Sequence, residues 1–326
     1  MEHTKINHSP LITAIENFVE DTIERTEPWE GYWIELADLL RELQEQYDSD
    51  LNYSAYNQAM IDLMLDLEQK IDSNVIDDSV MAELSFKDVQ SLFDKYEKRH
   101  QREVQRFKED ELKNRGKAME YTELLLEHYS RLAVIRVDLS YRQDWRIFID
   151  IADFRKDIRK LLDRLQDGDR HFRDLEGYVY ALEQGADKGY HAHFLLFYDG
   201  SSTKFDRYIA DCIIDTWKEI TGEAGQGYNC NTKQNRKSYL ERDKDALGTV
   251  NRGDHAKRAN VMNIVRYFTE PKKTEQYLKV RVKNMQTFGH GKFAKTSRRG
   301  IAETINRVKH DLRLEDGRKR PKRELN

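Results

Sequence analysis

Residues 177–197 read Gly-Tyr-Val-Tyr-Ala-Leu-Glu-Gln-Gly-Ala-Asp-Lys-Gly-Tyr-His-Ala-His-Phe-Leu-Leu-Phe, and they predict a β-hairpin. The aromatic and β-branched residues on both sides favour strands, and the segment from Gly185 to Gly189 has the composition of a turn. Successive side chains of a strand alternate between its two faces, so His191 and His193 point the same way.

The register of this hairpin places a carboxylate beside the two imidazoles. If Gln184 and Tyr190 are the pair that flanks a five-residue loop, Glu183 lies opposite His191. Directly opposed residues share a face, with their Cβ atoms about 4.5–5.5 Å apart. Glu183, His191 and His193 would then offer one oxygen and two nitrogens to a common point, which predicts an open metal site.

The ligand types leave the identity of the ion open. Two imidazoles and a carboxylate without a thiolate suit zinc, manganese, iron or magnesium. Such an ion could polarise a phosphoryl oxygen through its open positions. A pair of histidines separated by one residue also arises easily by chance among ten histidines. The alternative is therefore two core histidines bonded to their neighbours, with a glutamate that faces solvent.

Composition excludes several classes of protein. The 326 residues are enough for one large domain or two medium ones. There is no uninterrupted apolar run of about 18 residues, so no transmembrane span is expected. The N-terminus lacks the pattern of a secretory signal. With only Cys212 and Cys230, we expect neither a disulfide framework nor a cysteine zinc site, and a cytoplasmic location fits.

Charge is distributed very unevenly along the chain. Residues 1–50 hold 13 acidic against three basic residues, whereas residues 279–326 hold 15 basic against five acidic ones. A basic end of this kind often contacts nucleic acid. The candidate phosphate-binding cations are Arg298, Arg299, Arg318, Lys319 and Arg320. A solvated tail without a partner is the alternative.

Periodicity predicts an α+β fold, with an antiparallel sheet and flanking helices preceded by an all-helical region. Helical spacing is expected near residues 11–23, 33–43, 56–71, 86–129, 149–165, 204–220 and 254–268. Strands are expected at residues 132–140, at both arms of the hairpin, and at 228–232 after a glycine-rich connection.

Three parts follow from this pattern. Residues 1–120 form an acidic helical region, residues 121–292 the α+β domain, and residues 293–326 a basic tail. The highly charged stretch between residues 95 and 117 suits an exposed connecting helix. Two roles remain open for the first part: it contacts a partner such as a helicase or polymerase, or it shields the basic surface.

A tyrosine near the end of the helix at residues 254–268 is a candidate nucleophile. Tyr267 has lysines at positions 272 and 273 nearby, and a cation or a metal would favour its phenolate form. Because the chain has 17 tyrosines, a packing role is the alternative. Asp138, on the strand at residues 132–140, either faces the metal site or lies at a sheet edge.

Several of these segments, in this order, resemble one family. The sequence His191-Ala-His193 is similar to the histidine–hydrophobic–histidine (HUH) motif of rolling-circle replication endonucleases. The closer likeness is to the inovirus gene II-type replication initiators and the related YagK/YfjJ C-terminal domain. Residues 135–141, 217–222 with Gly225 behind them, and 287–292 also resemble that family's pattern. The resemblance covers about residues 130–292.

The resemblance implies a chemistry. Mg²⁺ or Mn²⁺ would be held by His191 and His193, with Glu183 as third ligand. Tyr267 would attack one phosphate of single-stranded DNA at a replication origin of a phage or other mobile element. The products would be a 5′-phosphotyrosine link and a free 3′-OH that primes rolling-circle replication.

One departure from the family pattern concerns the nucleophile. The family has Tyr-x-x-Lys, whereas here position 270 is glutamate and Pro271 follows. If residues 270–272 are an insertion, Lys273 is the counterpart lysine, and Tyr277 becomes a second candidate nucleophile. The departure also suits a DNA-binding regulator that has lost catalysis. Two further alternatives are a relaxase-like or transposase-like nuclease, and a metal hydrolase of a small substrate that uses water.

Overall fold

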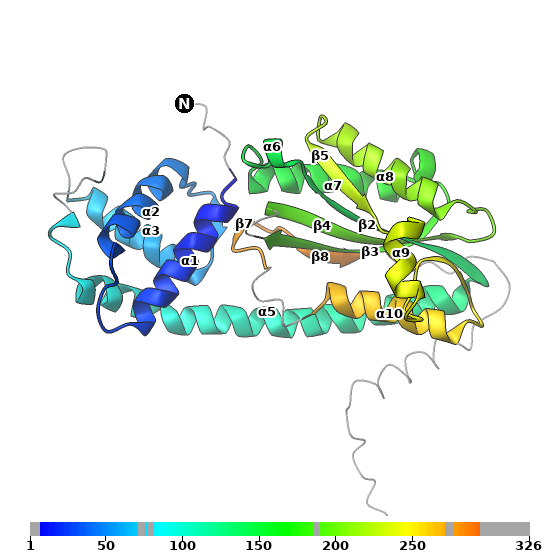
Figure 1. Cartoon of the computed structure of the whole chain (residues 1–326), viewed down its shortest axis with the longest axis horizontal. Coiled ribbons are helices and arrows are strands. Elements are labelled where there is room, and N and C mark those ends of the chain that lie inside the picture. Colours follow the sequence, from blue (N-terminus) through cyan, green and yellow to red (C-terminus); the bar gives the residue numbers. More distant parts are fainter. Residues whose placement is uncertain (1–6, 71–75, 77–80, 186–188, 271–276, 294–326) are drawn as a thin grey trace, which may run out of the picture.

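The chain is a mixed α+β protein, as predicted (Figure 1). The computed structural model describes residues 7–70, 76, 81–185, 189–270 and 277–293. Its N-terminal helices are α1 (Ser9–Glu24), α2 (Tyr32–Gln46), α3 (Ala55–Glu68) and α5 (Phe86–His128). Between α2 and α3 lies the short strand β1 (Leu51–Tyr53).

An antiparallel sheet forms the second part. Its strands are β2 (Arg131–Tyr141), β3 (Leu175–Gly185), β4 (Gly189–Asp199), β5 (Gly225–Asn229), β6 (Gly248–Asn251) and β8 (Phe288–His290). They run in the order β5-β2-β4-β3-β8, and β6 also pairs with β2. The strand β7 (Val280–Val282) pairs instead with β1, so it joins the two parts of the chain.

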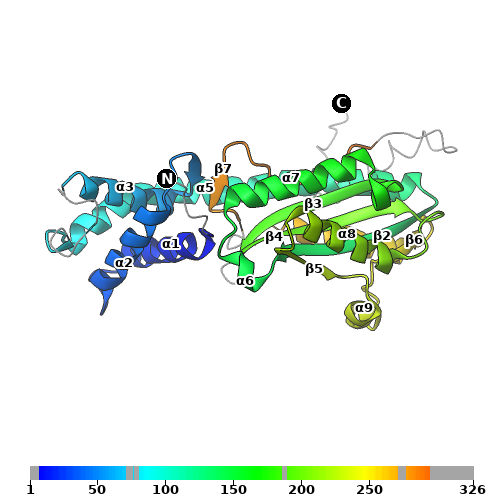
Figure 2. The same cartoon turned by 90° about the horizontal axis from the view of Figure 1, so that it is seen from above.

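Helices cover both faces of this sheet (Figure 2). One face packs on α7 (Ile151–Asp167) and α8 (Asp206–Ile220), the other on α5 and α10 (His255–Phe268). Along β2, Ala133 and Ile135 face α7 and α8, whereas Leu132 and Val134 face α5 and α10. Burial on both faces explains why these strands read as nearly continuous apolar runs. Smaller elements are α6 (Gln143–Arg146), α9 (Lys233–Leu240) and the 3₁₀ turn at Arg170–Phe172.

The starts of two helices follow from their capping residues. The Ser85 side chain accepts a hydrogen bond from the backbone N–H of Asp88 at the start of α5 (3.2 Å). Asp254 caps α10 in the same way through the N–H of Lys257 (3.0 Å). Each cap satisfies a backbone donor that the helix itself leaves unpaired.

The strand predicted at residues 228–232 is shifted, because β5 spans Gly225–Asn229. The glycines that suggested a connection instead allow α8 to pack against the strand. A Cβ atom on Gly227 would lie 2.5 Å from Cγ1 of Ile214, and one on Gly225 would lie 2.7 Å from the Trp217 ring. Glycine within a strand often marks such a close approach. The short strand β6 was not predicted.

Helix α5 runs along both parts of the protein (Figure 1). From residue 95 to 117 only Glu111 is buried, which agrees with the exposed connecting helix expected there. The boundary predicted near residue 120 falls inside α5, and the division into parts at that residue stays a prediction. Beyond it, Arg258 of α10 pairs with Glu123 and Glu127 of α5. Among the described residues, no helix has the length and apolar character needed to cross a bilayer.

A buried polar cluster joins the N-terminal helices to the chain after α10. Glu16 of α1 forms an ion pair with Lys279, and both residues are buried. The same carboxylate accepts hydrogen bonds from the hydroxyls of Ser54 (2.9 Å) and Tyr277 (3.0 Å). The cluster therefore ties α1 to the segment that precedes β7.

We expect Lys279→Met to destabilise the protein by about 3–5 kcal/mol, because it leaves the Glu16 carboxylate buried without its cation. Denaturant unfolding monitored by circular dichroism measures this change. Lys218→Met is the matched control, since its pair with Asp215 is largely exposed and should contribute little. Equal stability of the Lys279 and Lys218 variants would contradict the structural role of the cluster.

Candidate metal centre beside an exposed tyrosine

The hairpin β3–β4 has the register that the sequence predicts. Gln184 pairs with Tyr190, and Glu183 lies opposite His191. His193 lies opposite Ala181, on the same face. Residues of this parity, such as Ala181, belong to the apolar layer against α5 and α10. The two histidines and the glutamate therefore lie on the same face of the sheet as this apolar layer, and they form a polar group next to it.

The three side chains meet closely. The Nε2 atoms of His191 and His193 lie 3.4 and 3.3 Å from Oε2 of Glu183. One ligand atom from each residue falls within a group no wider than 4.8 Å. All three residues are buried, with exposed fractions of 7–9%. Within the described part of the chain, no other group of histidine, cysteine and carboxylate side chains is as close.

Both imidazoles are held through their other nitrogen. Nδ1 of His191 is 3.1 Å from the carbonyl oxygen of Gly189, and Nδ1 of His193 is 2.7 Å from Oδ1 of Asp138. These contacts fix the orientation of the rings and direct both Nε2 atoms towards Glu183. Histidine ligands of metal ions are usually oriented in this way by a carboxylate or carbonyl behind them.

A fixed cation supports the carboxylate behind His193. Arg136, two residues before Asp138 on β2, donates two hydrogen bonds to it, both 3.0 Å long. Burial alone would raise the pKa of Asp138. The hydrogen bond and charge of His193, together with Arg136, outweigh burial and lower that pKa to about 2. Asp138 is therefore a carboxylate at any pH near neutrality.

The electrostatics of His193 are those of a group between two carboxylates. Burial lowers its pKa, but hydrogen bonds and charges from Asp138 and Glu183 raise the pKa above the ordinary value. The two carboxylates therefore favour a positive charge at this position, such as the proton of a protonated His193. The same carboxylates would favour a metal ion there.

The donor set fits a divalent ion. Two ligands that are each about 2.1 Å from one ion lie about 3.0–3.4 Å apart for angles of 90–110°. The two Nε2–Oε2 separations, 3.3 and 3.4 Å, fall in this range. A cavity of ≈ 40 Å³ also lies beside Glu183, and Glu111 and Glu270 contribute to its lining. It is large enough for water molecules to enter. The buried group could therefore bind a metal ion, as the sequence predicts.

Tyr267 lies at the edge of this group. It is the penultimate residue of α10, the helix that covers this face of the sheet. Its ring centroid is 6.4 Å from that of His193, and its side chain is about half exposed. The guanidinium carbon of Arg136 lies 5.6 Å from the centre of the Tyr267 ring. An accessible phenol, two imidazoles and a fixed cation are thus neighbours.

Tyr277, the other candidate nucleophile, has a different environment. It is buried, and its hydroxyl donates a hydrogen bond to Glu16 of α1. Burial raises the pKa of Tyr277, and the charge of Glu16 and the hydrogen bond to it raise the pKa further. Tyr277 lines the small cavity beside Glu183, but its hydroxyl is engaged with the N-terminal helices.

Several residues predicted from the sequence lie outside the described ranges. These are Lys273 and the five tail cations Arg298, Arg299, Arg318, Lys319 and Arg320. In contrast, Asp138 was weighed as a site residue, and the structure places it against His193. Arg136 was missed, although its position two residues before Asp138 on a strand puts it on the same face.

The fold and the site define an α+β protein with a buried histidine–histidine–glutamate group beside an exposed tyrosine. Comparison with protein families gives a match to the YagK/YfjJ C-terminal domain over residues 94–291, more than half of the chain. The chain belongs to this family. Neither the curated proteins nor the solved structures contain a significant match.

We expect Asp138→Asn to weaken the binding of Mn²⁺ by about 10–100-fold. The amide still accepts a hydrogen bond from His193 but no longer supplies the negative charge that strengthens the imidazole as a ligand. Calorimetric titration of the protein with MnCl₂ measures the affinity. Asp215→Asn is the control, because Asp215 is an exposed residue of α8. Equal affinities of the two variants would exclude Asp138 as a support for the ligand.

We expect the affinity for Mn²⁺ to be lower at pH 6 than at pH 8. A metal ion must displace the proton on His193, whose raised pKa keeps that proton bound as the pH rises past the ordinary value of 6.5. The loss should approach about tenfold for each pH unit below that pKa. Titrations in buffers of different ionisation enthalpy count the protons released. An affinity independent of pH, with no proton released, would show that His193 is not a ligand.

Proposed function

We propose that this protein nicks single-stranded DNA at a replication origin, through a covalent link between Tyr267 and the DNA. One observation carries the proposal: an accessible tyrosine lies beside a buried group suited to a divalent ion. The resemblance of the His191-Ala-His193 segment to the HUH motif supports the same chemistry.

The proposed reaction is a transesterification. The hydroxyl oxygen of Tyr267 forms a bond to a backbone phosphorus, and the bond from that phosphorus to the 3′ oxygen breaks. The phenol loses its proton to solvent, and the departing 3′ oxygen gains one. The products are a 5′-phosphotyrosine ester and a free 3′-OH, which can prime rolling-circle replication.

The residues of the site have distinct proposed roles. Glu183, His191 and His193 would hold Mg²⁺ or Mn²⁺, which when bound supplies positive charge to the phosphoryl oxygens. Arg136 offers a second positive charge beside the Tyr267 ring, where the phosphate would arrive. Asp138 keeps both Arg136 and His193 in place.

The geometry favours Tyr267 over Tyr277 as the nucleophile. Tyr267 is half exposed, so that a DNA strand can reach it, whereas Tyr277 is buried and bonded to Glu16. An attack by Tyr277 would require that buried hydrogen bond to break. The proposed substrate is single-stranded DNA of a phage or mobile element in the cytoplasm. The basic C-terminal segment would contact the phosphates of this strand.

A second candidate function is a DNA-binding regulator without catalysis. It is favoured by Glu270, which stands where the family pattern has lysine and forms an ion pair with Arg115 of α5 (3.3 Å). This pair ties the chain after α10 to the long helix. The same binding surface would then serve recognition alone.

We expect Tyr267→Phe to reduce covalent protein–DNA adduct at least about a hundred-fold, because the attacking oxygen is absent. The substrate is a pool of single-stranded oligonucleotides with randomised hairpin loops, incubated with Mn²⁺, and the adduct is resolved on a denaturing gel. Tyr208→Phe, at an exposed tyrosine of α8, is the matched control. Binding of the pool should persist in both variants.

Three other outcomes would each support a different nucleophile or a different function. An adduct that survives in Tyr267→Phe and disappears in Tyr277→Phe would make Tyr277 the nucleophile. Binding without any adduct in the unmodified protein would support the regulator. Cleavage that persists in both tyrosine variants would indicate a hydrolase that uses water.

A further inference from the structure

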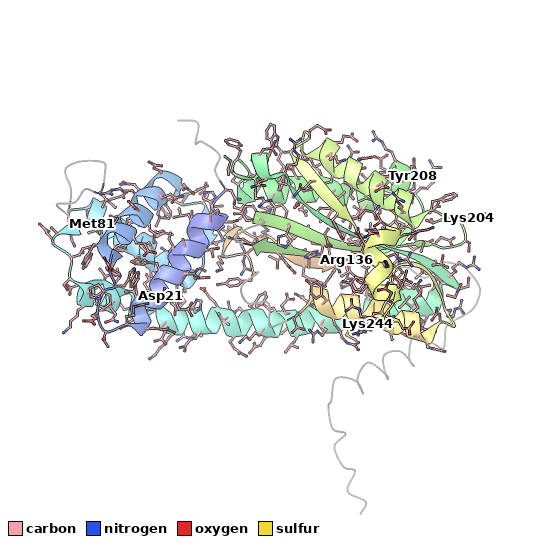
Figure 3. All side chains as sticks on the ribbon, viewed as in Figure 1. Asp21, Met81, Arg136, Lys204, Tyr208 and Lys244 are labelled. Atoms are coloured by element: carbon pink, nitrogen blue, oxygen red, sulfur yellow. The ribbon has the colours of Figure 1, made fainter. Side chains whose placement is uncertain are left out.

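A second cavity adjoins the metal centre and shares Arg136 and Asp138 with it. Its volume is ≈ 180 Å³. It lies where the sheet, α9 and α10 come together, and Figure 3 labels Arg136 and Lys244 in this region. The other lining residues include Tyr228, Arg236, Tyr239, Asp245, Ala246 and Leu247.

The lining combines aromatic, apolar and basic groups. Tyr228 and Tyr239 are about half exposed, and Lys244 is exposed as well. Ala246 and Leu247 are buried and give the cavity an apolar side. Exposed aromatic rings beside a basic residue are the usual platform for the bases of a single strand.

The carboxylates of the cavity are already compensated. Asp138 is held by Arg136, and Arg236 donates two hydrogen bonds to Asp245. These pairs remove most of the repulsion that a DNA phosphate would meet. Within the part of the chain that the structure describes, Lys244 has no carboxylate in ion-pair distance, so its charge is available to a phosphate.

The volume of the cavity limits its occupant. Pockets for drug-sized ligands have about 300–1,000 Å³, so this cavity of ≈ 180 Å³ takes a smaller group. A single nucleobase has a suitable size and a π-face for a tyrosine ring. Arg136 lines the cavity and also lies over the Tyr267 ring, so a base bound here would have its own phosphate close to Tyr267.

We infer that this cavity binds one nucleobase of single-stranded DNA, that of a nucleotide adjoining the phosphate attacked by Tyr267. The inference rests on the proposed function, because it assigns to the nicked strand a second point of attachment. Base binding here would place the strand in register with the metal centre.

The test uses the full-length protein in EDTA, so that binding is measured without cleavage. The probe is a pool of fluorescein-labelled single-stranded oligonucleotides of random sequence, and anisotropy gives the dissociation constant. Tyr239→Ala should weaken binding on the order of tenfold through lost stacking, whereas Tyr239→Phe should bind like the unmodified protein. Tyr208→Ala is the control, because Tyr208 is an exposed tyrosine of α8 that does not line the cavity.

An abasic oligonucleotide of equal length separates stacking from other effects. On it, the unmodified protein and Tyr239→Ala should bind equally, because no base is present to stack. A pool that contains 5-iodouracil should also, on irradiation, cross-link to Tyr228 or Tyr239, as mapped by mass spectrometry. Equal weakening on normal and abasic DNA, or cross-links confined to other residues, would overturn the inference.

The two proposals fail in different ways. If the protein binds the pool and Tyr239→Ala has no effect, the base site is refuted while nicking by Tyr267 stands. If the base-dependent loss is seen but no adduct forms with Mn²⁺, the base site stands and the protein is a DNA-binding regulator. Absence of any binding to single-stranded DNA would refute both.

Discussion

The alternation of side chains along three neighbouring strands brings the proposed metal ligands and the residues that support them to one place. Glu183 on β3, His191 and His193 on β4, and Arg136 and Asp138 on β2 share one face of the sheet. A slip of one residue in the hairpin would turn the glutamate towards α7 and α8 and break the group. The pairing of Gly185 with Gly189 therefore belongs to the register on which the metal centre depends.

The same face carries charges that alternate in sign. Arg136 compensates Asp138, and Asp138 faces His193. His193 in turn lies beside the buried carboxylate of Glu183. Two carboxylates therefore flank His193, and they favour a positive charge there, either a proton or a metal ion.

Much of this was predictable because it is local. The hairpin register followed from the pairing of Gln184 with Tyr190, and the longer helices followed from their apolar spacing, whereas the short helices α6 and α9 were not predicted. The position of Tyr267 beside His193 was not local, since it depends on how α10 packs on the sheet. The hydrogen bond from Tyr277 to Glu16 joins residues 261 positions apart, and no pattern in the sequence indicates it. Glycines at positions 225 and 227 were read as a connection, because their packing role becomes visible only with α8 in place.

Helix α5 has a consequence for how the parts of the protein cooperate. Its 43 residues span about 65 Å at 1.5 Å per residue, without a break between the N-terminal helices and the sheet. Pairs from Arg258 fasten its far end to α10, and the Glu16–Lys279 pair closes the arrangement from the other side. One continuous helix therefore connects the N-terminal helices to α10, which carries Tyr267. A partner bound to the N-terminal helices would lie at a distance from Tyr267 that the length of α5 determines.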